Sequence, residues 1–217
     1  GVSQPLFVET ADDVERQARV FRKMLRFTCF VAFPVMFGIS IVGRELILIA
    51  LGQKWLESAG MLMLLCVSGA FLPLVSLYTQ FLLSRGRSVM YLLGLAAMVA
   101  VQLATALLTY PYGVMTMLLF YVGINVVWLG VWHLLVQRLL PVTMRQAARD
   151  VLPYLCTAVG VMGFTYWSVA QCALPIVGAL LAKVVIAALL YPAVLWCFGS
   201  EMLRESANYL FKKKKRP

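Results

Sequence analysis

The stretch that decides the fold is residues 88–137, SVMYLLGLAAMVAVQLATALLTYPYGVMTMLLFYVGINVVWLGVWHLLVQ, which contains no Asp, Glu, Lys or Arg. A membrane-spanning helix needs about 20 apolar residues, so this run is long enough for two spans. Its middle, Tyr110-Pro111-Tyr112-Gly113, combines turn-forming residues with tyrosines of the kind that line membrane surfaces. The run therefore predicts a hairpin of two membrane helices, over about 88–109 and 114–136.

The rest of the chain repeats this pattern of long uncharged runs. Hydrophobic residues make up 62% of the chain, charged residues 13%, and the mean hydropathy is +0.88. Residues 58–84 and 151–182 also lack charged side chains. This composition predicts an all-α integral membrane protein with six transmembrane helices within a lobe at 27–198. The six spans are expected at about 24–43, 59–83, 88–109, 114–136, 151–170 and 174–198.

Positive charge is concentrated in four clusters, and two predicted spans separate each cluster from the next. The clusters are Arg16, Arg19, Arg22, Lys23 and Arg26; Arg85 and Arg87; Arg138, Arg145 and Arg149; and Arg204 with Lys212, Lys213, Lys214, Lys215 and Arg216. Because basic loops stay on the cytoplasmic side of a membrane, all four clusters and both chain ends are expected to be cytoplasmic. The net charge of +10 then needs no nucleic-acid partner, and we predict none.

The two ends of the chain carry their own predictions. Residues 1–26 are expected to form a cytoplasmic loop and an amphipathic entry helix, which starts at Ala11 after a capping box of Thr10 and Asp13. Residues 199–217 form a basic cytoplasmic tail, in which Lys212–Arg216 can bind anionic lipid headgroups. Because the chain opens on Gly1 without an initiator Met, we expect a fragment of a longer protein.

Residues 43–57 form the one sizeable connection on the opposite side of the predicted membrane. This segment has too many Leu and Ile residues for a solvated loop, so we predict a short helix at the outer membrane surface, ended by Gly52. Three of its residues, Arg44, Lys54 and Trp55, are expected at the outer interface. Glu45 and Glu57 are then available to partner the two cations.

Lys183 is the one cation that this topology places inside a span. A charge there costs a few kcal/mol and usually faces a cavity or a partner. Ala179, Ala187 and Tyr191 share its helix face. Two interpretations remain open, a cation that lines a transport path and a lysine that snorkels or binds a carbonyl within the bundle. With polar residues of other spans, the candidate substrate path comprises Lys183, Tyr191, Asn125, Gln102 and Gln80.

The sequence offers little to enzyme chemistry. The five cysteines, Cys29, Cys66, Cys156, Cys172 and Cys197, lie in apolar runs without metal-ligand spacing. Glycine-rich phosphate loops, paired carboxylates and nucleophile elbows are missing from the sequence. We therefore predict no catalytic residue, no metal, no cofactor and no enzyme activity.

The first part of the chain resembles a known family. The segments that carry the resemblance occur in a familiar order, Pro5-Leu6-Phe7, Asp12-Asp13-Val14-Glu15-Arg16, Phe21-Arg22-Lys23-Met24-Leu25-Arg26, Phe33-Pro34-Val35-Met36-Phe37-Gly38 and Leu51-Gly52-Gln53-Lys54-Trp55. The chain resembles the polysaccharide transporter branch of the multidrug/oligosaccharidyl-lipid/polysaccharide exporter superfamily, the bacterial flippases for lipopolysaccharide, O-antigen and capsule. The specific part of the resemblance covers roughly residues 3–91.

The resemblance implies the C-terminal lobe of a flippase of about 12 to 14 helices in the bacterial inner membrane, working with its N-terminal lobe by alternating access. The implied substrate is a polyprenyl-diphosphate-linked oligosaccharide, whose tail would lie against spans five and six. Membrane lipids, and glycosyltransferases or a polymerase, are the further partners to expect. Three alternatives stay open. The first is a drug or organic-cation antiporter of the same superfamily, which would use acids in the membrane, and the second is a membrane glycan polymerase or ligase, which would need polar outer loops. The third is a non-transporting membrane anchor for a glycosyltransferase complex.

Overall fold

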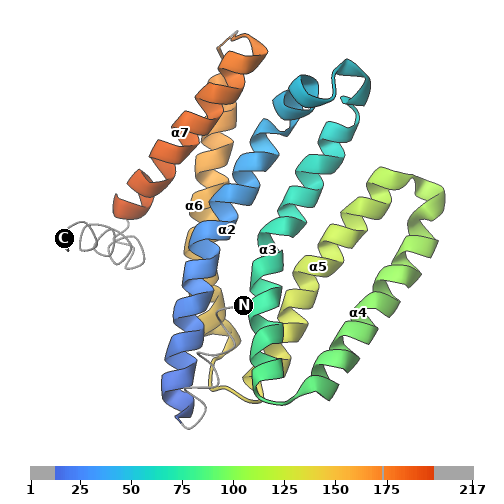
Figure 1. The fold of residues 1–217 in the computed structure, drawn as a ribbon, viewed down its shortest axis with the longest axis vertical. Coiled ribbons are helices and arrows are strands. Elements are labelled where there is room, and N and C mark those ends of the chain that lie inside the picture. The colour runs from blue at the N-terminus through green and yellow to red at the C-terminus, as the bar shows by residue number, and fades with distance from the viewer. Residues whose placement is uncertain (1–12, 173, 198–217) are drawn as a thin grey trace, which may run out of the picture.

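The structure is a computed structural model that describes residues 13–172 and 174–197. These residues form six long helices, α2 (Val14–Ala50), α3 (Ser58–Ser84), α4 (Ser88–Thr109), α5 (Val114–Gln137), α6 (Met144–Ala170) and α7 (Ile176–Cys197). Helices that follow one another in the chain run in opposite directions, so the connections gather at two ends of the bundle (Figure 1). Five of them, α2, α3, α4, α5 and α7, are long and apolar enough to cross a membrane. The prediction of an all-α, multi-pass membrane protein is confirmed.

α6 is the long helix that is not among those five. It joins the predicted basic inner segment and the predicted fifth span into one helix, which packs against α2 and α7. A capping box fixes its start, because the Thr143 hydroxyl accepts a hydrogen bond from the Gln146 N–H at 3.3 Å and the Gln146 side chain accepts one from the Thr143 N–H at 3.0 Å. That α6 crosses the membrane stays a prediction.

The start of α2 differs from the predicted one. The helix begins at Val14 instead of Ala11, because the side chain of Asp13 accepts a hydrogen bond from the Arg16 N–H at 2.9 Å and is itself the N-cap. Thr10, the other half of the predicted capping box, lies outside the described residues.

The predicted separate surface helix at 43–57 is wrong, because α2 continues without a break to Ala50. Gly43 is buried against α3, where an added Cβ would lie 3.4 Å from a methyl carbon of Leu62, so this glycine allows close packing and does not end the helix. The end comes at Gly52, as predicted, with φ 83° and an N–H that donates to the Ile47 carbonyl at 3.1 Å. A single 3₁₀ turn, η1 (Gln53–Trp55), then leads into α3.

The core of the bundle is built around α2, which packs against α3, α6 and α7. Phe21, Leu25, Cys29 and Phe33 follow one another at four-residue spacing along α2 and are all fully buried. α4 is the opposite case, because it packs mainly against α5 and buries only Gly94 and Thr109. Figure 1 shows α4 at the edge of the bundle, remote from α2 and α7.

The first three basic clusters lie at one end of the bundle. Arg22 in α2 donates to both carboxylate oxygens of Asp150 in α6, at 2.6 and 3.0 Å, and Arg26 lies 3.8 Å from the same carboxylate. Arg85, after α3, donates to the side chain of Gln17 in α2. The start of α2 and the α3–α4 and α5–α6 connections meet at the lower end in Figure 1. This arrangement fits a common side for these clusters, and the cytoplasmic assignment of that side stays a prediction. The fourth cluster lies outside the described residues.

The contact between α4 and α5 yields a test of the packing. A Cβ added at Gly94 would lie 2.9 Å from the indole ring of Trp132, which is 1% exposed and stacks on the ring of Tyr91. We expect Gly94→Ala to lower the melting temperature of the intact protein in detergent, at a cost of about 1–3 kcal/mol, by overpacking this contact. Gly123→Ala is the matched control, because a Cβ there meets nothing within 4 Å. Equal melting temperatures for the two variants would contradict the packing.

Candidate functional site: an ion pair beside an apolar groove

Lys183 lies on the face of α7 that packs against the rest of the bundle. The buried residues of α7 are Lys183, Ala187, Tyr191 and Leu195, which recur at four-residue spacing. Lys183 itself is 4% exposed. The structure therefore places Lys183 and Tyr191 on one buried stripe, as their spacing predicted.

The Lys183 ammonium joins three helices. Its Nζ donates to the Ile41 carbonyl at 2.9 Å and to Glu45 Oε1 at 2.6 Å, both in α2. The same nitrogen lies 4.9 Å from the ring centroid of Tyr166 in α6, which is a cation–π geometry. Lys183 therefore binds a backbone carbonyl within the bundle, as one of its two predicted roles required. It also has an acidic partner from another helix, Glu45.

Glu45 is the functional residue that sequence reasoning missed. The carboxylate was expected to partner Arg44 or Lys54 at the surface, and this expectation is wrong, because it pairs with Lys183 while Arg44 and Lys54 are exposed. Adjacent residues of a helix point in different directions, so Arg44 cannot share the face of Glu45. The available signal was an acid followed directly by an apolar run, residues 46–51.

The pair is nearly withdrawn from solvent. The Lys183 side chain is 5% exposed and that of Glu45 is 13% exposed. Glu45 Oε2 is buried without a hydrogen-bond partner among the described residues. Each charge is thus held in place chiefly by the other, and removing one would leave the second uncompensated.

A groove of about 380 Å³ lies beside the ion pair, between α2 and α7. Its lining is apolar except at a few positions and includes Pro34, Gly38, Ile41, Met162, Lys183 and Tyr191. Tyr191 uses its hydroxyl to donate to the Phe30 carbonyl at 3.2 Å, which fixes α7 against α2. The groove therefore offers an apolar wall with one ammonium at its margin.

The structure does not gather the other candidate path residues around Lys183. Asn125 is buried and donates to the Tyr121 carbonyl within α5 at 2.8 Å. Gln102 lines a separate cavity of about 300 Å³, formed by residues of α3, α4 and α5. Gln80 donates to the Ser76 hydroxyl within α3 at 2.8 Å. A path along these residues stays a prediction.

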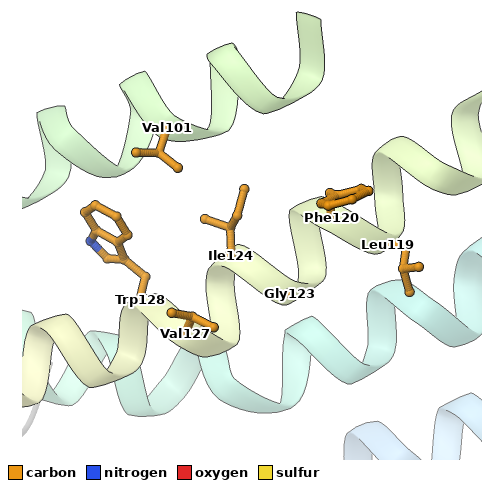
Figure 2. Close-up of a pocket in the computed structure, with 7 residues that line it drawn as sticks. All are labelled: Val101, Leu119, Phe120, Gly123, Ile124, Val127 and Trp128. Carbon is orange, nitrogen blue, oxygen red and sulfur yellow. The ribbon is translucent and has the colours of Figure 1, made fainter. Parts of the chain in front are cut away.

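A second groove, of about 430 Å³, lies between α4 and α5 and is purely hydrophobic in character. Figure 2 shows Ile124 and Trp128 of α5 on the side of Val101, which comes from α4. Leu119, Phe120, Gly123 and Val127 complete the lining, which includes no charged residue. This groove can accept hydrocarbon, and the indole N–H of Trp128 is the polar group of a side chain in its lining.

The residues predicted at the outer interface lie at the end of the bundle that carries the α2–α3 turn. Arg44 and Lys54 are exposed, and Trp55 is 53% exposed on the 3₁₀ turn. Their position leaves them free to meet lipid headgroups, which stays a prediction. The lysines of the terminal tail, 212–215, lie outside the described residues.

Comparison with known proteins gives partial matches. Residues 1–60 match the profile of a family described as "Polysaccharide biosynthesis protein". The chain is 33% identical over 66 residues to an "Uncharacterized membrane protein in cps region" of Klebsiella pneumoniae, covering 30% of this chain and 14% of the relative. It is 32% identical over 65 residues to the lipopolysaccharide biosynthesis protein WzxC of Escherichia coli, covering 30% and 13%.

A third relative extends the match. The teichuronic acid biosynthesis protein TuaB of Bacillus subtilis is 26% identical over 132 residues, covering 56% of this chain and 27% of TuaB. The matches thus span between 13% and 27% of the lengths of these relatives. No solved structure matches the chain. Together these matches support the resemblance to a family of polysaccharide biosynthesis flippases.

The ion pair yields a test by paired substitution. Lys183→Met leaves the Glu45 carboxylate without its partner, so we expect a loss of about 3–5 kcal/mol and a lower melting temperature in detergent. The double variant Glu45→Gln/Lys183→Met should recover most of this loss, because neither charge remains. Lys54→Met is the control, since Lys54 is exposed at the same end of the molecule. A Lys183→Met protein as stable as Lys54→Met would show that the pair does not form.

Proposed function

We propose that the chain is part of a flippase that carries a polyprenyl-diphosphate-linked oligosaccharide across the bacterial inner membrane. Its relatives are named for lipopolysaccharide and teichuronic acid biosynthesis, and the chain is a multi-pass membrane protein. Because the matches span a small part of each relative, the activity belongs to the whole transporter. This chain would supply its C-terminal lobe and act by alternating access with the N-terminal lobe.

The observation that carries the proposal is the position of Lys183 at the margin of an apolar groove. The proposed substrate has an apolar polyprenyl tail, an anionic diphosphate and a polar glycan in sequence. An ammonium at the edge of a hydrocarbon-lined groove suits the junction of tail and diphosphate. Lys183 would then contact the diphosphate while the tail lies against α2 and α7.

The two ends of the bundle would face opposite sides of the membrane. The three basic clusters at one end of the bundle would face the cytoplasm, and the basic tail at 212–216 would meet anionic lipid there. Arg44, Lys54 and Trp55 at the other end would meet the outer leaflet. Glycosyltransferases or a polymerase would act on the glycan before and after it crosses.

A cation antiporter is the alternative that one observation favours, because Glu45 is an acid within the helical bundle. Such a transporter needs a carboxylate that is free to bind its cation. Glu45 is already bound by Lys183 at 2.6 Å, so the pair as a whole carries no net charge. A cation would have to displace the Lys183 ammonium, and the relatives named for polysaccharide biosynthesis support an anionic lipid-linked substrate instead.

A polymerase or ligase receives less support. The connections at the end of the bundle opposite the basic clusters include η1 (Gln53–Trp55) and η2 (Tyr110–Tyr112), each a single 3₁₀ turn. Short turns such as these offer little surface on which catalytic groups could be arranged. We propose a transporter and not an enzyme.

Leaflet exchange in proteoliposomes tests the proposal. The intact protein should exchange a labelled polyprenyl-diphosphate oligosaccharide faster than protein-free liposomes do. The Glu45→Gln/Lys183→Met variant, which avoids an unpaired charge, should lose at least about tenfold in exchange rate, equivalent to about 1.4 kcal/mol of barrier. Lys54→Met should retain the wild-type rate. Exchange by the wild-type protein no faster than in protein-free liposomes would overturn the proposal.

A further inference from the structure

The Glu45 carboxylate is only half engaged. Oε1 accepts the hydrogen bond from Lys183, and Oε2 is buried without a partner among the described residues. A buried oxygen without a hydrogen bond is costly unless it gains a proton, a ligand or a water molecule. The free oxygen is therefore a place where the state of Glu45 can change.

Of the groups that the neighbouring helices place near Glu45, the charged one in contact with it is Lys183. α7 contributes Lys183, and α6 contributes Tyr166, whose ring lies against the Lys183 ammonium. α3 contains no charged residue along 58–84, and at Gly43, two residues before Glu45 in α2, it presents Leu62 and Met63. Arg44 is exposed and makes no ion pair with any of the residues that the structure describes.

An anion that binds Lys183 must therefore change the charge of Glu45 as well. The pair is neutral at present, so each ionised phosphate that approaches Lys183 adds a negative charge, and the broken ion pair leaves the Glu45 carboxylate uncompensated beside an apolar groove. An excess charge of this kind costs several kcal/mol in a membrane interior. A proton on Glu45 removes one of these negative charges and gives the carboxyl a donor of its own.

We propose that Glu45 is a proton-binding site whose occupancy is coupled to anion binding at Lys183. A phosphate oxygen of a prenyl diphosphate takes over the hydrogen bond that Lys183 donates to Glu45 Oε1, and the ammonium keeps its charge. Glu45 takes up one proton from water at the nearby end of α2, so an O–H bond forms on the carboxylate as the ion pair breaks. Release of the anion reverses both changes. The inference rests on the proposed function at one point, the contact of Lys183 with a lipid diphosphate.

The site is close enough to water for this exchange. Glu45 lies five residues before the end of α2 at Ala50, which corresponds to about 8 Å along a helix. Its side chain is 13% exposed, whereas Lys183 is more deeply buried. The proton therefore does not have to cross the bundle.

Calorimetry of the intact protein in lipid nanodiscs tests the coupling. The probe is the diester of farnesyl diphosphate and glucose, because its phosphates keep their charge near neutral pH. Titration in HEPES and in Tris, which differ in ionisation enthalpy, counts the protons taken up on binding. We expect about one proton per probe for the wild type, with an affinity that falls about tenfold per pH unit. Glu45→Gln should bind the probe with no proton uptake and little pH dependence.

A control variant and the pattern of outcomes distinguish a failure of proton coupling at Glu45 from a failure of the proposed flippase activity. Glu57→Gln removes an exposed acid near the same end of the bundle and should behave as the wild type does. Wild-type binding without proton uptake, or equal uptake by Glu45→Gln, would overturn the inference and leave the flippase standing. Failure of the wild type to bind the probe would overturn the inference and remove Lys183 from the proposed path. Coupled binding without leaflet exchange would uphold the inference and refute the function.

Discussion

The packing of α2 against three other helices is the constraint on which the rest of the structure depends. Helices within a bilayer gain little from the hydrophobic effect, because lipid tails are as apolar as leucine. Close packing and polar contacts must therefore decide which helices are neighbours. α2 supplies both, with a stripe of fully buried side chains along its length and ion pairs from Arg22 to Asp150 of α6 and from Glu45 to Lys183 of α7. These two pairs lie toward opposite ends of α2, so together they fix its orientation against both partners.

The bundle divides into two parts of different character. α2, α6 and α7 are joined by ion pairs and by the hydrogen bond from Tyr191 to the Phe30 carbonyl. In contrast, α4 and α5 meet around a groove lined by apolar residues. α3 connects them, through its contact with α2 and through the Tyr78 hydroxyl, which lies 3.0 Å from His133 Nδ1 of α5. Paired charges thus lie in the first part, and an apolar groove lies in the second.

Much of the fold follows from local sequence features, and the site does not. Uncharged runs bounded by Arg85 and Arg87, or by Tyr110 to Gly113, predicted α3, α4 and α5 to within one residue, because charges and turn residues mark helix ends whatever the neighbours are. Gly43 was misread as a break, since a glycine that ends a helix and one that allows close packing look alike in a sequence.

Partners that lie far apart in the chain are beyond such reasoning. Lys183 could be recognised as a charge inside a span, but Glu45 lies 138 residues away, and Asp150 lies 128 residues from Arg22. Both pairings depend on which helices are neighbours, and hydropathy does not contain that information. The same limit explains why Gln80, Gln102 and Asn125 shared a predicted path with Lys183. Helical spacing places each on a face of its own helix and says nothing about which faces meet.

The proposed binding of phosphate at Lys183 also gives a physical reason for the presence of Glu45 beside it. A lone lysine in this position would be costly while the groove is empty, and a strong permanent partner would compete with every ligand. A carboxylate that holds the ammonium with one oxygen is an intermediate case, because it neutralises the charge at rest and can itself be neutralised by a proton. The proton then offsets one of the negative charges that a bound diphosphate brings. Loss of that proton restores the ion pair, which helps the site to release its substrate as well as to bind it.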